Sequence, residues 1–141
     1  MLQPLASADA VLLDDERVLR GAKKFVPDAA VASLFVVSVT WRGSAALVVV
    51  RADQLGAGAV RPNTLIDQTK RSANVDFSGV RVDDNNMICG AGVAAALRDI
   101  RLLGALLVAA EATGSAAACL DTIVDYLKTR KQFGKLIGSY Q

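Results

Sequence analysis

Apolar residues gather in short, valine-rich runs through the first half of the chain. The runs at 33–41 and 45–51 are separated by Arg42 and Gly43, which have the length of a hairpin loop. β-Branched and aromatic residues dominate both runs, as the pleated surface of a sheet prefers. We therefore predict two antiparallel strands joined by a tight turn.

Two further segments carry a strand signal. The segment 18–26 is predicted as a strand with a turn near Gly21, where glycine supplies conformational freedom. The segment 71–82 alternates between apolar and polar residues and predicts a half-buried strand. Its buried face is predicted to carry Ala73, Val75 and Phe77.

The period of the pattern changes after the polar segment 82–92, and helical spacing runs from Val93 to about Phe133. Gly114 lies within this segment, either as a close packing contact or as a break between two helices, and the surrounding alanines favour the contact. The apolar positions form two stripes: Leu97, Ile100, Leu103 and Leu107, then Leu120, Ile123, Val124 and Leu127.

Gly134 is predicted to follow the helix as its C′ glycine, with Lys128, Arg130 and Lys131 in the final turn. The two halves together predict an α+β fold. In it, an antiparallel β-domain, sandwich-like or barrel-like, is followed by one long helix or two helices end to end.

Composition narrows the possible functions. With a net charge of +2 and no basic stripe, the chain does not resemble a nucleic-acid or membrane-surface binder. The absence of histidine removes the usual base and imidazole metal ligand, and we expect no metal site. The two cysteines are expected to be reduced, buried thiols of a cytoplasmic protein. The apolar stretch 103–120 is interrupted by polar residues and predicts a buried helix, with no membrane span.

The last twelve residues contain a spaced motif. Arg130, Phe133, Gly134, Ile137 and Gln141 fit the pattern R-x-x-F-G-x-x-I-x-x-x-Q. This pattern resembles the end of the first helix in the carboxyl-terminal helical domain of the acyl-CoA dehydrogenase family.

Two other segments resemble the middle β-domain of the same family, in the same order. The first matches the pattern L-x-G-x-K-x-[FW]-[VI]-x-x-A at Leu19, Gly21, Lys23, Phe25, Val26 and Ala29. The second resembles the last strand of that domain at Asp67, Thr69, Arg71, Ala73, Val75, Phe77, Gly79, Val80 and Val82.

The resemblance implies a domain plan and an activity. Residues 1–84 would be the middle β-domain, and residues 85–141 the start of a four-helix carboxyl-terminal domain, so that the chain is a truncated member. The family oxidises the α,β bond of acyl-CoA thioesters with FAD in fatty-acid and related lipid metabolism. Its members assemble as oligomers, so we expect homo- or hetero-oligomers with related chains.

The resemblance also implies a set of cofactor-binding residues. From the residues alone, Arg130 is a cation at a helix end; the family pattern instead assigns it to the FAD pyrophosphate, often of a neighbouring subunit. Phe133 packs against the helix end in one interpretation and contacts FAD in the other. Phe25 either covers the flavin ring or packs within the strand. The full implied set is Arg130, Gln141, Phe133, Phe25, Val26 and Ser7.

Several positions depart from the family pattern. Pro27 offers no hydroxyl or N–H where the family has a threonine or serine. Gly104 and Ala105 occupy the positions where some members place the catalytic glutamate and an arginine. Glu111 is interpreted as a helix-surface or packing residue, so no catalytic base is assigned. The alternative function is therefore a non-catalytic partner subunit that scaffolds an active paralogue or completes its FAD site.

Overall fold

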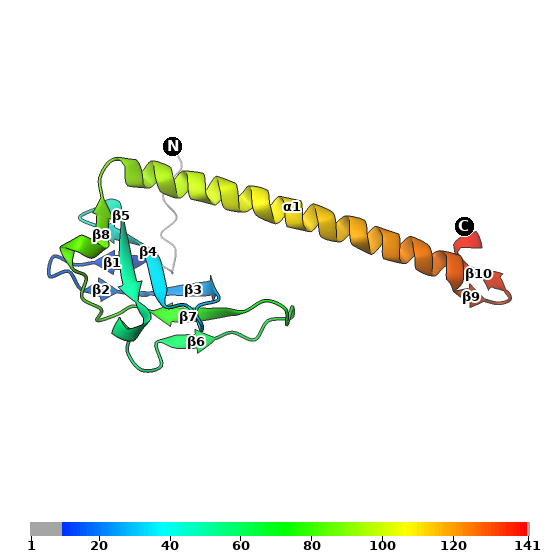
Figure 1. Ribbon diagram of the computed structural model, residues 1–141, viewed down its shortest axis with the longest axis horizontal. Helices are drawn as coiled ribbons and strands as arrows, with labels where there is room; N and C mark the ends of the chain where they lie inside the picture. Colours follow the sequence, from blue (N-terminus) through cyan, green and yellow to red (C-terminus); the bar gives the residue numbers. More distant parts are fainter. Residues whose placement is uncertain (1–9, 141) are drawn as a thin grey trace. The chain divides into compact units, whose positions relative to one another are not determined.

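The structure is a computed structural model and describes residues 10–140 (Figure 1). The chain forms two compact units, Met1–Ala95 and Ala96–Gln141. The first unit holds two β-sheets. The larger sheet has the order β2-β1-β4-β5-β8. Its strands are β1 (Val11–Leu13), β2 (Leu19–Arg20), β4 (Leu34–Trp41), β5 (Ser44–Arg51) and β8 (Met87–Cys89).

The hairpin of β4 and β5 is confirmed. The two strands pair antiparallel over their whole length, from Leu34 opposite Arg51 to Trp41 opposite Ser44. Arg42 and Gly43 form the connection with φ values of 48° and 78°, as a type I′ turn requires. One pair departs from the antiparallel pattern, because β1 runs parallel to β4.

The smaller sheet has the order β3-β7-β6, with β3 (Ala22–Pro27), β6 (Val60–Pro62) and β7 (Ser72–Asp76). The alternation predicted for β7 is confirmed, since Ala73 and Val75 are fully buried. Gly21, at a φ of 118°, joins β2 to β3 and so carries the chain from the larger sheet to the smaller one.

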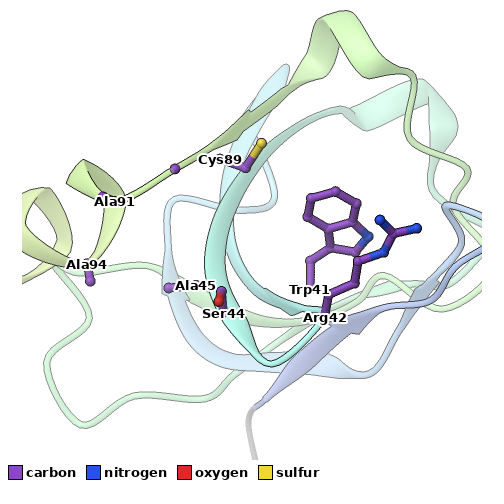
Figure 2. Close-up of a pocket in the computed structure, with 8 residues that line it drawn as sticks. Trp41, Arg42, Ser44, Ala45, Cys89, Ala91 and Ala94 are labelled. Atoms are coloured by element: carbon purple, nitrogen blue, oxygen red, sulfur yellow. The ribbon is translucent and has the colours of Figure 1, made fainter.

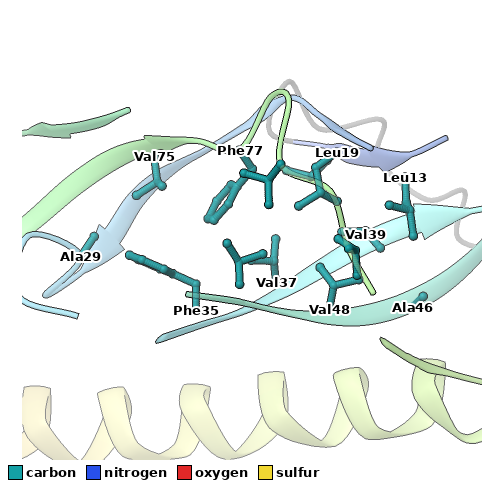
Figure 3. Packing of buried hydrophobic residues seen from close by; sticks show 14 of the residues in the cluster. Leu13, Leu19, Ala29, Phe35, Val37, Val39, Ala46, Val48, Val75 and Phe77 are labelled. Atoms are coloured by element: carbon teal, nitrogen blue, oxygen red, sulfur yellow. The ribbon is translucent and has the colours of Figure 1, made fainter. Parts of the chain in front are cut away.

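Buried side chains of the two sheets form one core (Figure 3). The rings of Phe35 and Phe77 meet edge to face, with centroids 5.7 Å apart. Valines from β4, β5 and β7 fill the remaining space, and the buried core includes Val37, Val39, Val48, Val50 and Val75. The predicted α+β class, with antiparallel sheets followed by one long helix, is confirmed, and the sheets do not close into a barrel.

The helical segment forms a single helix, α1 (Gly92–Thr129). It is continuous through Gly114, so a break there is wrong, and a Cβ at this glycine would meet no described atom within 4 Å. From 98 to 129 every residue except Val124 is exposed. Exposed apolar residues lie on more sides than the predicted stripes and include Leu102, Leu106 and Val108. No helix among the described residues is long and apolar enough to cross a membrane.

The predicted helix end is wrong. The helix stops at Thr129, and a short hairpin of β9 (Lys131–Gln132) and β10 (Lys135–Leu136) follows. Phe133 and Gly134 are its turn, at φ values of 49° and 77°. Gly134 is thus a turn residue and no C′ glycine, and Arg130 lies beyond the helix. Next to the last strand pair, Ile137 donates its N–H to the carbonyl oxygen of Arg130 at 2.9 Å, which extends the hairpin pairing by one residue pair.

A carboxylate in the β1–β2 turn predicts acid sensitivity. The N–H of Val18 and the guanidinium of Arg20 both donate to Asp14, and they lower the pKa of its carboxyl below the ordinary 3.8. The folded state therefore binds fewer protons than the unfolded state, and this stabilisation is lost as pH falls through the lowered pKa. We expect Asp14→Asn to flatten the acid side of the curve of unfolding free energy against pH, measured by urea unfolding. An unchanged slope would contradict this.

Candidate functional site

Phe25 lies in a β-bulge on β3. Lys23 pairs with Val75 and Val26 with Ala73, so Lys24 and Phe25 together stand opposite one residue of β7. Phe25 has a φ of 51°, which is unusual for a bulky side chain, and its side chain is 66% exposed. The interpretation in which this ring packs within the strand is therefore wrong, and the ring is available to a ligand.

Two clefts border the Phe25 side chain. One has a volume of about 430 Å³ and is lined mainly by apolar residues of β3 and β4, including Leu34 and Val36. The other has a volume of about 700 Å³ and is lined by Pro27, Asp28 and Leu65 together with a polar and cationic run before and at the start of β7, namely Gln68, Thr69, Lys70, Arg71 and Ser72. An aromatic ring between an apolar cleft and a polar cleft suits a ligand that has both a ring system and polar groups.

The polar cleft is held in place by local hydrogen bonds. Asp67 accepts from the hydroxyl and the N–H of Thr69 at 2.6 and 2.9 Å, and these bonds lower the pKa of its carboxyl. Arg71 pairs with Asp28 at 3.0 Å. The loop is thus attached to the turn that follows β3.

The neighbours of Phe25 differ in what they offer. Val26 is half-buried and packs against the core, so the structure gives its side chain a packing role. Pro27 ends β3 and is exposed, and it has no N–H to donate. Phe25 and Pro27 line both clefts, and Val26 lines the apolar one.

The predicted residues of the second unit lie on the terminal hairpin. Phe133 is at its tip and is 93% exposed, so packing of this ring against the helix end is wrong. Arg130 precedes β9 and is exposed, and within residues 10–140 no carboxylate lies within ion-pair distance of its guanidinium. An exposed, uncompensated guanidinium is suited to a phosphate.

Some predicted positions contribute no chemistry that the structure describes. Ser7 and Gln141 lie outside the described residues. Gly104 and Ala105 are exposed on α1, and Gly104 faces open space. Glu111 is also exposed on α1. Among residues 10–140, no group of three or more histidine, cysteine or acidic side chains lies in metal-binding range.

A third cleft, of about 560 Å³, is lined by Trp41, Arg42 and the segment after β8 (Figure 2). The guanidinium carbons of Arg17 and Arg42 lie 5.1 and 4.7 Å from the indole centroid. Sequence reasoning missed this cleft, because a lone tryptophan at a hairpin signals no contact with a residue twenty-four positions away. The expectation of buried thiols is wrong, since Cys89, which lines the cleft, and Cys119 are both exposed.

Comparison with known proteins gives a consistent result. Residues 90–141 match the family model for the carboxyl-terminal domain of acyl-CoA dehydrogenase. The chain is 29% identical over 136 residues to the mitochondrial short/branched chain specific acyl-CoA dehydrogenase of Bos taurus. That alignment covers 90% of this chain and 31% of the bovine enzyme, so the chain spans about a third of this relative.

Solved structures share the fold. The glutaryl-coenzyme A dehydrogenase glutaryl-CoA complex superposes with a TM-score of 0.76 at 22% identity, covering 96% of this chain and 36% of that one. An acyl-CoA dehydrogenase complexed with FAD from Bacillus anthracis superposes with a TM-score of 0.74 at 19% identity, covering 96% and 24%. Residues 90–141 thus match the acyl-CoA dehydrogenase family model, and nearly the whole chain shares the fold of solved acyl-CoA dehydrogenases.

Proposed function

We propose that this chain carries part of the FAD site of an acyl-CoA dehydrogenase, an enzyme that oxidises the α,β bond of an acyl-CoA thioester. The observation that carries the proposal is Phe25, an exposed aromatic ring between an apolar and a polar cleft. It stands where the family motif places its flavin-flanking aromatic residue. The similar fold of a relative complexed with FAD supports this assignment.

The residues of this chain would bind and orient the cofactor. When bound, FAD supplies the hydride acceptor. Phe25 would cover one face of the ring system and exclude water from it. Arg130 would neutralise the FAD pyrophosphate of a neighbouring subunit through its planar fork of donors, and Phe133 would add apolar contact to that same cofactor. Gln141 and Ser7 complete the proposed set.

A non-catalytic variant of this function has specific support. Pro27 cannot donate a hydrogen bond to the flavin, and Gly104 and Ala105 cannot remove a proton or pair with a charge. In this second candidate the chain is a partner subunit that lends Arg130 to the FAD of an active paralogue. Both candidates share residues 1–84 as the middle β-domain and 85–141 as the start of the helical domain.

One experiment separates the candidates. The purified chain is mixed with FAD and filtered, and the bound flavin is measured by its absorbance. A series of saturated acyl-CoA thioesters is then added without oxygen, alone and with a related full-length chain. Flavin that bleaches with the chain alone supports the enzyme. Flavin that bleaches only in the mixture, and faster than with the full-length chain by itself, supports the partner subunit. A chain that retains no flavin under either condition contradicts both.

The exposed apolar surface of α1 predicts self-association. A helix that is apolar on most of its sides is stable in water only when it is covered, and single helices are marginal. We expect light scattering to give a mass above that of one chain, and the double variant Leu103→Lys/Leu107→Lys to shift it towards a monomer. Ser115→Lys/Thr122→Lys, which adds the same charge without removing apolar groups, is the control. A wild-type monomer would contradict this prediction.

A further inference from the structure

The bulge that presents Phe25 has an unusual conformation that needs a specific support. A phenylalanine at a φ of 51° is strained relative to the extended conformation of a strand. The bulge also interrupts the hydrogen-bond ladder between β3 and β7, which leaves backbone groups in need of other partners. Other contacts must therefore stabilise the positive φ of Phe25 and accept a hydrogen bond from its backbone N–H.

That partner is the side chain of Asn74. The Phe25 N–H donates to Asn74 Oδ1 at 3.1 Å, across 49 residues of sequence. Asn74 is the residue of β7 that stands opposite the bulge, between Val75 and Ala73. Its carboxamide oxygen thus takes the place of a ladder acceptor for the residue whose ring faces the clefts.

Asn74 is itself held from the other side of β7. Asn63, which follows β6, donates through Nδ2 to Asn74 Oδ1 at 3.4 Å and to Ser72 Oγ at 3.0 Å. The N–H of Asn63 donates to the carbonyl oxygen of Ser72 at 2.9 Å. All three polar residues are half-buried, so their side chains have restricted freedom. The oxygen that receives the Phe25 N–H is therefore held by Asn63, which is itself bonded to Ser72 of β7.

We infer that Asn74 is a positioning residue that holds the Phe25 ring between the two clefts in the orientation that receives flavin. This inference rests on the proposed function of Phe25. Asn74 touches the backbone of Phe25 and does not line either cleft. It acts by selecting the left-handed bulge before a ligand arrives, which reduces the ordering cost of binding.

The test compares two variants of the full chain. Asn74→Leu has a similar volume and lacks the acceptor, and Asn74→Asp retains an oxygen that accepts both hydrogen bonds. Amide hydrogen exchange of Phe25, measured by NMR without flavin, reports the contact directly. We expect the amide of Phe25 to exchange at least about tenfold faster in Asn74→Leu than in wild type. In Asn74→Asp, the exchange rate of this amide should remain close to the wild-type rate. Asn85→Leu, at an exposed asparagine of another segment, is the matched control.

Flavin affinity is the second measurement. We expect FAD to bind at least about fivefold more weakly to Asn74→Leu, with affinity restored in Asn74→Asp. Unchanged exchange at Phe25 in Asn74→Leu would overturn the inference. Faster exchange with unchanged FAD affinity would also overturn it, because the ring would then need no positioning. If wild type retains no FAD, the proposed function fails, and the exchange rates alone decide whether Asn74 holds the bulge.

Discussion

Replacing Arg130 with alanine is expected to weaken FAD binding by one to two orders of magnitude. A hydrogen bond to a charged group contributes about 1.5–3 kcal/mol, and each 1.4 kcal/mol corresponds to a factor of ten in affinity. The guanidinium is exposed at the base of the terminal hairpin, so its removal should leave the thermal unfolding curve unchanged. Fluorescence titration of FAD measures the affinity, and circular dichroism measures the melting.

Two further variants separate geometry from charge. Arg130→Lys retains the charge and loses the planar fork, so it should bind FAD with intermediate affinity. Lys131→Ala removes a neighbouring exposed cation from β9 and should bind nearly as wild type. Equal losses in Arg130→Ala and Lys131→Ala would mean that the hairpin attracts FAD by net charge alone, and the assignment of Arg130 would be wrong.

The largest loss of stability is expected for Gly21→Ala, at about 3 kcal/mol or more. The φ of 118° is unfavourable for any residue with a Cβ, at roughly 1–3 kcal/mol. The added Cβ would also lie 2.6 Å from the carbonyl oxygen of Ala10, a backbone atom that cannot turn away. Gly21 lies where the chain passes between the two sheets, so the strain would act on both. Urea unfolding measures the loss.

Gly43→Ala is the matched control. Gly43 also has a positive φ, of 78°, but a Cβ there would meet no described atom within 4 Å. The free energy of unfolding of Gly43→Ala should therefore fall by only about 1 kcal/mol, which is the cost of a positive φ for a residue with a Cβ. If the two variants lost the same free energy of unfolding, the close contact with Ala10 would have no energetic effect.

The strands of the β-unit were predictable where their signals were local. The valine runs and the Arg42-Gly43 turn lie within 20 residues of one another, and β4 and β5 form as predicted. The parallel contact of β1 with β4 was not predictable, because a three-residue strand carries little pattern of its own. The pairing of β1 with β4 depends on how both strands pack against the core, and this packing cannot be read from their separation along the chain.

The errors at the end of the helix and in the bulge have physical reasons. A glycine after a helical pattern adopts positive φ both as a C′ residue and in a tight turn, so Gly134 fits either structure. The structure forms the turn, with Lys135 opposite Gln132. The motif selected Phe25 as a cofactor residue. The β-bulge at Phe25 could not be predicted from the local sequence, because it depends on the pairing register of β3 with β7, about 50 residues later.

The two prolines that end β3 and β6 have a consequence for the behaviour of the protein at high concentration. These strands are the outer strands of the smaller sheet, and such strands can recruit strands of other molecules into aggregates. Pro27 and Pro62 each remove a backbone donor from an outer strand, which shortens the stretch available for pairing. Pro27 and Pro62 thus limit intermolecular strand pairing at both edges of the smaller sheet.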